Sequence, residues 1–191
     1  DQPIAEVRSR VRAGVPVADH PIDLGHLLER ELVDVGPLVA EPHLVEQPRD
    51  LDIVTTAADF AAVRAVLAAR GQDITPPPHP QYATRHFARF DMGDGLSVDL
   101  IADMAIKLEK GSYRWPFDAS ARFETDGLPW CCPEDWALLY RLMGREEQTE
   151  ALDEWLDEHG VQHPQRLAAN LFAQYPASAM QPAPDWWPWD E

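Results

Sequence analysis

Cysteine is scarce in this sequence, and the little there is excludes a disulfide-stapled protein. The two cysteines, Cys131 and Cys132, are adjacent. Neighbouring cysteines can pair with each other only in a strained ring, so no disulfide framework is available. Buried, reduced thiols in a cytoplasmic protein are the better interpretation.

Positive charge is scarce as well. Asp and Glu number 33 against 16 Lys and Arg, a formal net charge of −17, and Lys107 and Lys110 are the only lysines. Such a field repels phosphate backbones, so we expect no broad nucleic-acid surface. A bound nucleotide stays compatible with this charge, because a metal ion can neutralise its phosphates locally.

Long apolar runs are missing too. No segment approaches the length of a membrane span, and the first twelve residues contain no apolar signal region. We therefore predict a soluble, cytoplasmic protein without a membrane partner. Hydrophobic residues still make up 45% of the chain, which is enough for a sizeable core.

Hydrophobic periodicity divides the chain into three parts. These are an N-terminal extension over residues 1–21, an α/β domain over 22–130, and a helical portion over 131–191 with a Pro/Trp-rich tail. The predicted elements are helices at 22–34 and 56–70, a strand at 49–56, a hairpin of 84–92 with 96–102, an irregular segment at 103–132, and helices from 133, at 146–158 and at 164–175. The fold class is α/β, with a small mixed β-sheet and flanking helices.

Three acidic residues on the predicted strands form the one polar arrangement that indicates chemistry. Asp50 and Asp52 lie two apart and share a strand face, while Asp99 lies between Val98 and Leu100 in a strand that should be buried. A buried carboxylate is costly unless a positive group is bound there. Three convergent carboxylates can hold one or two Mg²⁺ ions. The alternative is that Asp99 pairs across the hairpin with Arg85 or Arg89.

These motifs carry a family resemblance. The run Arg49-Asp50-Leu51-Asp52-Ile53-Val54, a helix closing at Gly71, and then Ser97-Val98-Asp99-Leu100-Ile101 resemble the minimal nucleotidyltransferase (polymerase-β-like) superfamily. The branch with AbiEii-type toxins and aminoglycoside or lincosamide nucleotidyltransferases is the most similar. The resemblance covers about residues 24–158.

The resemblance implies Mg²⁺-dependent transfer of a nucleoside monophosphate from a nucleoside triphosphate to a hydroxyl acceptor. Asp50 and Asp52 would bind Mg²⁺, and Asp99 would complete the metal site and help deprotonate the acceptor. The backbone of Gly36 would approach the triphosphate. The further nucleotide contacts that it implies are Arg49, Arg141 and Arg145.

Two departures from the family pattern leave a second interpretation open. Pro37 stands where Gly or Ser is expected, and it lacks the N–H that would bind a phosphate oxygen. Tyr140 stands where this branch often has a lysine. The alternative is a catalytically degenerate member of the superfamily that serves as a binding or interaction module.

The C-terminal portion holds two further expectations. The acidic helices after Pro133 are interpreted as a solvated face. In the tail, prolines alternate with Trp186, Trp187 and Trp189. We expect Trp186 or Trp187 to pack on the chain's own helices, because three exposed tryptophans would form a large apolar patch. Self-association or a protein partner bound through this tail is the alternative.

Overall fold

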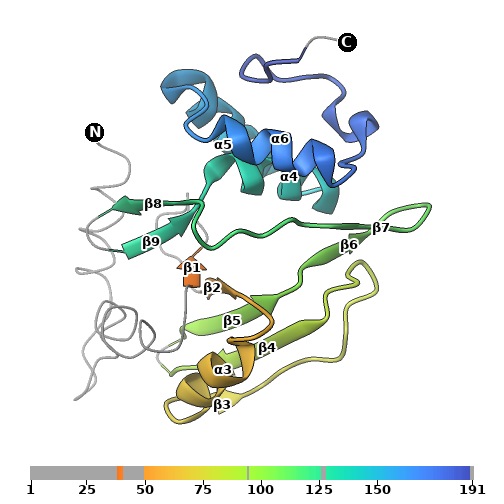
Figure 1. The fold of residues 1–191 in the computed structure, drawn as a ribbon. Helices are drawn as coiled ribbons and strands as arrows, with labels where there is room; N and C mark the ends of the chain where they lie inside the picture. Colours follow the sequence, from red (N-terminus) through yellow and green to blue (C-terminus); the bar gives the residue numbers. More distant parts are fainter. Residues whose placement is uncertain (1–37, 41–49, 94, 126–127, 190–191) are drawn as a thin grey trace.

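A seven-stranded mixed β-sheet forms the centre of the molecule in a computed structural model that describes residues 38–40, 50–93, 95–125 and 128–189. The strand order is β3-β4-β5-β2-β1-β9-β8, and β6 pairs separately with β7. The strands are β1 (Leu38–Ala40), β2 (Asp50–Thr55), β3 (Gln72–Asp73), β4 (His86–Asp91), β5 (Ser97–Ala102), β6 (Ala105–Lys107), β7 (Ser112–Arg114), β8 (Arg122–Thr125) and β9 (Leu128–Cys131). The helices are α3 (Phe60–Ala68), α4 (Pro133–Met143), α5 (Glu146–His159), α6 (Pro164–Phe172) and the 3₁₀ helix η3 (Ala177–Met180). The predicted fold class, a small mixed sheet with flanking helices, is confirmed (Figure 1).

The sheet is mixed, with two parallel pairs of strands among antiparallel ones. The central strands β2 and β5 are parallel, β4 and β5 form the predicted antiparallel hairpin, and β1 is antiparallel to β2 and parallel to β9. A parallel pair needs a crossover, and α3 lies on the connection from β2 towards β4 and β5.

One face of the sheet is closed by α3. Alternate residues of β2 and β5 point to this side and are buried against Val63 and Leu67 of the helix. They are Leu51, Ile53, Val98 and Leu100. The predicted alternation in these strands is therefore confirmed. Because these residues are buried against α3, the residues between them must project from the opposite face of the sheet.

The opposite face is divided between an apolar end and a polar end. Val54 and Ile101 lie near the ends of β2 and β5 and join the large core made with α4, α5 and α6, which lie on the other side of the sheet from α3 (Figure 1). The beginnings of the same two strands carry the acidic residues. The C-terminal helices thus cover only part of this face.

The expectation for residues 103–132 is wrong, because this segment is not irregular. It contains the four short strands β6 to β9. Strands of three or four residues show too little alternation to be recognised in a sequence. In addition, β9 pairs with β1, where Ala40 lies opposite Trp130, a residue ninety positions later.

The helix predicted over 56–70 is shorter at both ends in the structure. Helix α3 begins at Phe60, and the hydroxyl oxygen of Thr56 accepts the Asp59 backbone N–H at 3.2 Å in the turn before it. Gly71 follows the helix without a left-handed backbone conformation. Its role is close packing, since a Cβ there would lie 2.7 Å from the Asp91 carbonyl oxygen of β4.

The three C-terminal helices begin where the sequence predicts, although α6 ends at Phe172 rather than at 175. The interpretation of their acidic residues as a solvated face holds for most of α5 and is wrong for the start of α4, where Glu134 and Asp135 are buried. Their partners come from α6 and its N-terminal end, distant in sequence.

The tail packs on the molecule as predicted. Trp186 is buried in the C-terminal core, and its indole Nε1 donates to Asp153 Oδ1 at 2.8 Å. Trp187 packs against the same core, whereas Trp189 is 41% exposed.

The extension over 1–21, the helix over 22–34 and Gly36-Pro37 lie outside the described residues. The three-part division of the chain therefore stays a prediction. Among the described residues, no helix has the length and apolarity to cross a membrane.

Candidate functional site

The polar end of the sheet face is built from three adjacent strands in fixed register. Asp52 of β2 lies opposite Asp99 of β5, and Asp99 lies opposite Arg89 of β4. Two residues nearer the start of β2, Asp50 lies opposite Ser97 of β5, and Ser97 lies opposite Asp91 of β4. Paired residues of neighbouring strands project to the same side. Asp50, Asp52, Asp99 and Arg89 therefore share one face, and we call these four residues the acidic face.

Exposure of the carboxylates falls from the edge of the acidic face inwards. Asp50 is exposed, Asp52 is half-buried, and the side chain of Asp99 is only 9% exposed. This gradient follows from the chain direction, because both strands run from the open end towards the apolar core under the C-terminal helices.

Arg89 binds Asp99 with two parallel hydrogen bonds. Its Nε donates to Asp99 Oδ1 and its Nη2 to Asp99 Oδ2, both at 2.5 Å. Such bidentate pairs are the strongest of the arginine–carboxylate contacts. Of the two arginines that the sequence left open, Arg89 is the partner, whereas Arg85 makes a looser contact with Asp103 at 3.5 Å.

The charges of the acidic face act on each other. Burial raises the pKa of Asp99, and repulsion from Asp52 and Asp50 raises it further, while the hydrogen bonds from Arg89 act in the opposite direction. The pKa of Arg89 is raised first by its hydrogen bonds to Asp99, and attraction by Asp52 and Asp50 adds to this. Three carboxylates and one guanidinium leave an excess of negative charge that favours a further cation.

The donor set fits one hard divalent cation. Within the described ranges, neither Asp50 nor Asp52 makes a hydrogen bond or ion pair with another side chain, so their oxygens are available. Mg²⁺ binds proteins through one or two carboxylates and takes its remaining ligands from substrate phosphates and water. No group of three or more His, Cys, Asp or Glu side chains in the described part of the chain is gathered closely enough to hold a metal ion. The fit is therefore to two carboxylates, with Asp99 engaged by Arg89.

The remaining predicted site residues do not gather at the acidic face. Gly36 and Arg49 lie outside the described residues. Arg141 of α4 is ion-paired with Asp153 of α5, and the Arg145 guanidinium lies over the Tyr140 ring, 5.7 Å from its centroid. Both arginines are thus engaged within the helical portion, and their role in binding a nucleotide stays a prediction.

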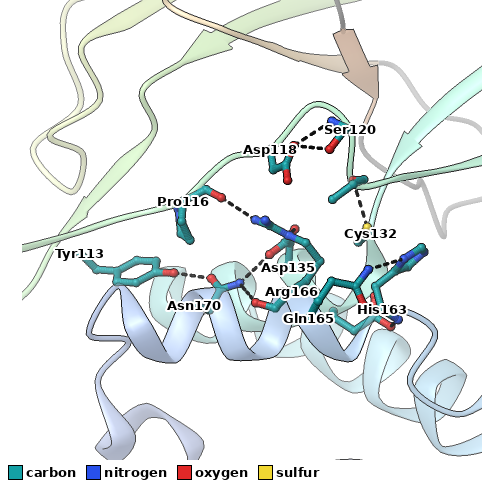
Figure 2. Close-up of polar contacts among 12 residues, drawn as sticks. Tyr113, Pro116, Asp118, Ser120, Cys132, Asp135, His163, Gln165, Arg166 and Asn170 are labelled. Carbon is teal, nitrogen blue, oxygen red and sulfur yellow. Dashed lines mark hydrogen bonds and ion pairs between the residues drawn. The ribbon is translucent and has the colours of Figure 1, made fainter.

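A second cluster of buried charges, which sequence reasoning missed, lies between the helical portion and the segment after β7 (Figure 2). Arg166 Nε donates to Asp135 Oδ2 at 2.8 Å, and Arg166 Nη2 donates to the Pro116 carbonyl at 2.6 Å. Asn170 donates to the other Asp135 oxygen at 2.6 Å and accepts the hydroxyl of Tyr113. The sequence signal for this cluster was the spacing of Arg166 and Asn170, which are four residues apart and so lie on the same side of a helix.

This second cluster holds the helices in place and offers no open site. Both Asp135 oxygens are hydrogen-bonded, and the Arg166 side chain is 4% exposed. The neighbouring Cys132 thiol donates to the Ala121 carbonyl, and burial raises the pKa of this thiol to about 12. Buried and satisfied in this way, the cluster serves to fix α4 and α6 against the sheet side of the molecule.

Comparisons with known proteins give one structural likeness. No protein-family model matches the chain, and no curated protein sequence matches it. The structure is similar to the crystal structure of a Thermotoga maritima protein that carries the provisional name of nucleotidyltransferase, with a TM-score of 0.47 and 22% identity. The match covers 73% of this chain and 98% of the other. At this score the likeness gives no argument about activity or about the AbiEii-type branch.

Proposed function

We propose that the protein is a Mg²⁺-dependent nucleotidyltransferase that moves a nucleoside monophosphate from a nucleoside triphosphate to a hydroxyl acceptor. The observation that carries the proposal is the register of β2 and β5, which sets Asp52 opposite Asp99 with Asp50 on the same open face. An acid-hydrophobic-acid strand beside a strand with a third acid is the pattern on which the superfamily resemblance rests, and its AbiEii-type branch is part of the proposal.

Each acid has a distinct task in this proposal. Asp50 and Asp52, whose oxygens are available, would hold Mg²⁺. The ion supplies charge neutralisation for the triphosphate and for the departing pyrophosphate. Asp99 is the most buried of the three and would accept the proton of the acceptor hydroxyl.

The transfer needs no reactant other than the nucleoside triphosphate and the hydroxyl acceptor. The acceptor oxygen forms a bond to the α-phosphorus, the bond from that phosphorus to the bridging oxygen of the β-phosphate breaks, and pyrophosphate leaves with the bond's electron pair. The acceptor proton passes to a carboxylate oxygen of Asp99. The apolar residues Val54 and Ile101 bound the reacting face on the side of the C-terminal helices, where they exclude water.

The alternative, a degenerate member acting as a binding or interaction module, is favoured by one observation. Arg89 occupies both oxygens of Asp99, so the carboxylate that would act on the acceptor is already engaged by a cation. A protein of this kind would bind a nucleotide through Asp50, Asp52 and Mg²⁺ without transferring it.

The test separates binding from transfer. Each of the four ribonucleoside triphosphates, labelled at the α-phosphate, is incubated with Mg²⁺, the full chain and separate pools of small molecules, RNA and protein. Pyrophosphate release and label transfer are measured together with nucleotide binding by calorimetry. We expect Asp52→Asn to abolish both transfer and Mg²⁺-dependent binding, because it removes a ligand without altering the buried face of β2.

Asp103→Asn is the matched control. It makes the same chemical change in a turn at the end of β5, at a positive φ of 53° that asparagine tolerates. Transfer that survives in this control and is lost in Asp52→Asn supports the enzyme. Binding without transfer by the unchanged chain supports the interaction module, and the absence of Mg²⁺-dependent nucleotide binding contradicts both.

A further inference from the structure

We propose that a hollow beside the β6–β7 turn binds a small-molecule anion, with a phosphate or carboxylate head group on a short apolar body. The hollow has a volume of about 450 Å³, which is within the range of small-molecule sites. Its walls come from the β6–β7 turn, the end of α4 and the segment of η3, which are far apart in the sequence. The site is separate from that of the proposed function, because β6 follows the end of β5 and the acidic face lies at its beginning (Figure 1).

The first support is the positive charge at the hollow. In a chain with a net charge of −17, Lys110 and Arg141 line it together with one acid, Glu109. Lys110 is exposed and makes no hydrogen bond or ion pair with any residue that the structure describes, so its ammonium group is available. Its backbone is held in a tight turn, where the Leu108 N–H donates to the Gly111 carbonyl at 3.2 Å. This local charge favours an anion as the ligand.

The second support is that the guanidinium of Arg141 has N–H donors to spare. The Arg141 side chain is only 13% exposed, and its Nη2 donates to Asp153 Oδ2. Its Nε is buried and has no hydrogen-bond acceptor among the described residues. The buried Arg166, in contrast, uses both Nε and Nη2. Buried polar groups are normally hydrogen-bonded, so Arg141 can accept a further anionic oxygen while Asp153 keeps it in place.

The third support is the apolar part of the wall. Leu108, Leu142 and Ala179 line the hollow and also pack against the large core under the C-terminal helices. These side chains are therefore held in position without a ligand, and the exposed hydroxyl of Ser178 lies beside them. An apolar body on the ligand covers this wall, whereas a bare inorganic ion leaves it in contact with water. The two kinds of wall together favour an anion that carries an apolar group.

The test uses four small probes with the full chain, in the presence of EDTA and without nucleotide. Saturation-transfer NMR follows the binding of phenyl phosphate, benzoate and benzyl alcohol, and inorganic phosphate is added as a competitor. We expect benzyl alcohol and inorganic phosphate to bind roughly tenfold more weakly than the better of the two aromatic anions, because each offers only half of the recognised chemistry.

The two aromatic anions identify the head group. Tighter binding of phenyl phosphate assigns a phosphate ester to the hollow, and tighter binding of benzoate assigns a carboxylate. If neither of them binds more tightly than benzyl alcohol, the proposal is overturned.

The two lysines of the chain provide a matched pair of variants. Lys110→Gln should weaken binding of the preferred anion roughly tenfold, since it removes the unpaired charge at the hollow. Lys107→Gln makes the same change at an exposed position of β6 that does not line the hollow, and it should bind like the unchanged chain. An unaltered affinity in Lys110→Gln, or an equal loss in Lys107→Gln, overturns the proposal.

A second pair of variants tests the place of binding. Ser178→Phe puts a ring into the hollow and should abolish the saturation transfer, whereas Ala177→Phe adds the same ring at the neighbouring exposed position outside it. Binding that survives in Ser178→Phe contradicts the assigned place, and so does an equal loss in both variants. If Ser178→Phe does not fold, the lysine pair decides alone, because both lysines are exposed and their replacement disturbs no packing.

The outcome is separable from that of the proposed function. Without a divalent ion the acidic face repels anions, so Asp52→Asn should bind the preferred anion like the unchanged chain, and a loss in this variant would overturn the inference. Nucleotide transfer by a chain that binds neither aromatic anion supports the transferase and contradicts the hollow as a site. Binding that depends on Lys110 in a chain that neither binds nor transfers a nucleotide does the reverse.

Discussion

Removing Arg166 should destabilise the protein more than removing any exposed arginine. The change Arg166→Met keeps the apolar stem but leaves Asp135 charged, buried and bound only by Asn170. Breaking a buried ion pair from one side costs about 3–5 kcal/mol, because an uncompensated charge stays in the interior. The Pro116 carbonyl loses its donor as well. We therefore expect the free energy of unfolding to fall by about 4 kcal/mol.

The measurement is urea unfolding of the full chain, followed by circular dichroism. Arg85→Met is the matched control, because Arg85 is 66% exposed and its ion pair should contribute less than about 1 kcal/mol. The double variant Arg166→Met/Asp135→Asn removes the stranded charge and should recover about half of the loss. The reasoning is refuted if Arg166→Met costs less than about 1 kcal/mol, or if the double variant is no more stable than the single one.

Three other outcomes are expected. Hydrogen bonds from Thr75 lower the pKa of Asp73 to about 2, so the stabilising contribution of Asp73 is complete above the ordinary pKa of 3.8 and disappears as the pH falls towards 2. In Thr75→Val, carbon-13 NMR titration should find the Asp73 pKa nearer 3.8. An unchanged pKa would contradict this assignment. Trp186→Ala should lower the free energy of unfolding by about 3 kcal/mol, while Trp189→Ala, at an exposed ring, should change it little; equal effects would argue against docking of the tail. Cys132 should not react with a disulfide reagent at pH 8 in the native protein, since burial raises the pKa of its thiol to about 12, and it should react after denaturation. A fast reaction of the native protein would contradict that burial.

The parts of the fold that the sequence predicts are those whose pattern is local. Alternation within β2 and β5 was enough to separate Asp50 and Asp52 from the buried Leu51 and Ile53, and the glycines after Met92 were enough to predict the hairpin. Helical spacing was likewise enough for α4, α5 and most of α6.

The parts that escaped prediction depend on partners far away in the chain. Strand β9 pairs with the nearby β8 and also with the distant β1, and nothing within its four residues indicates the pairing with β1. Glu134 looked like a solvated acid of a first helical turn, yet its Oε1 accepts the backbone N–H groups of Gln162 and His163 at 2.6 and 2.7 Å. For this oxygen, contact with water is replaced by hydrogen bonds to residues some thirty positions later, which no local pattern encodes.

The candidate site was half predictable for the same reason. The carboxylates could be assigned to one face from alternation, but the choice between Arg85 and Arg89 as partner of Asp99 required the register of the hairpin. A turn between Met92 and Leu96 fits more than one register, and only the packed β4–β5 pair sets Arg89 opposite Asp99.

The alternation in β2 and β5 also affects how this protein can change over generations. Every second residue of these strands belongs to the core with α3, and the residues between them carry the acidic face. Substitutions at Asp50 or Asp52 therefore leave the packing untouched, so a lineage can lose the chemistry of this face, or acquire a different one, at little risk to folding. Selection for stability therefore acts on one set of positions and selection for activity on the other, although both sets lie in the same two six-residue strands.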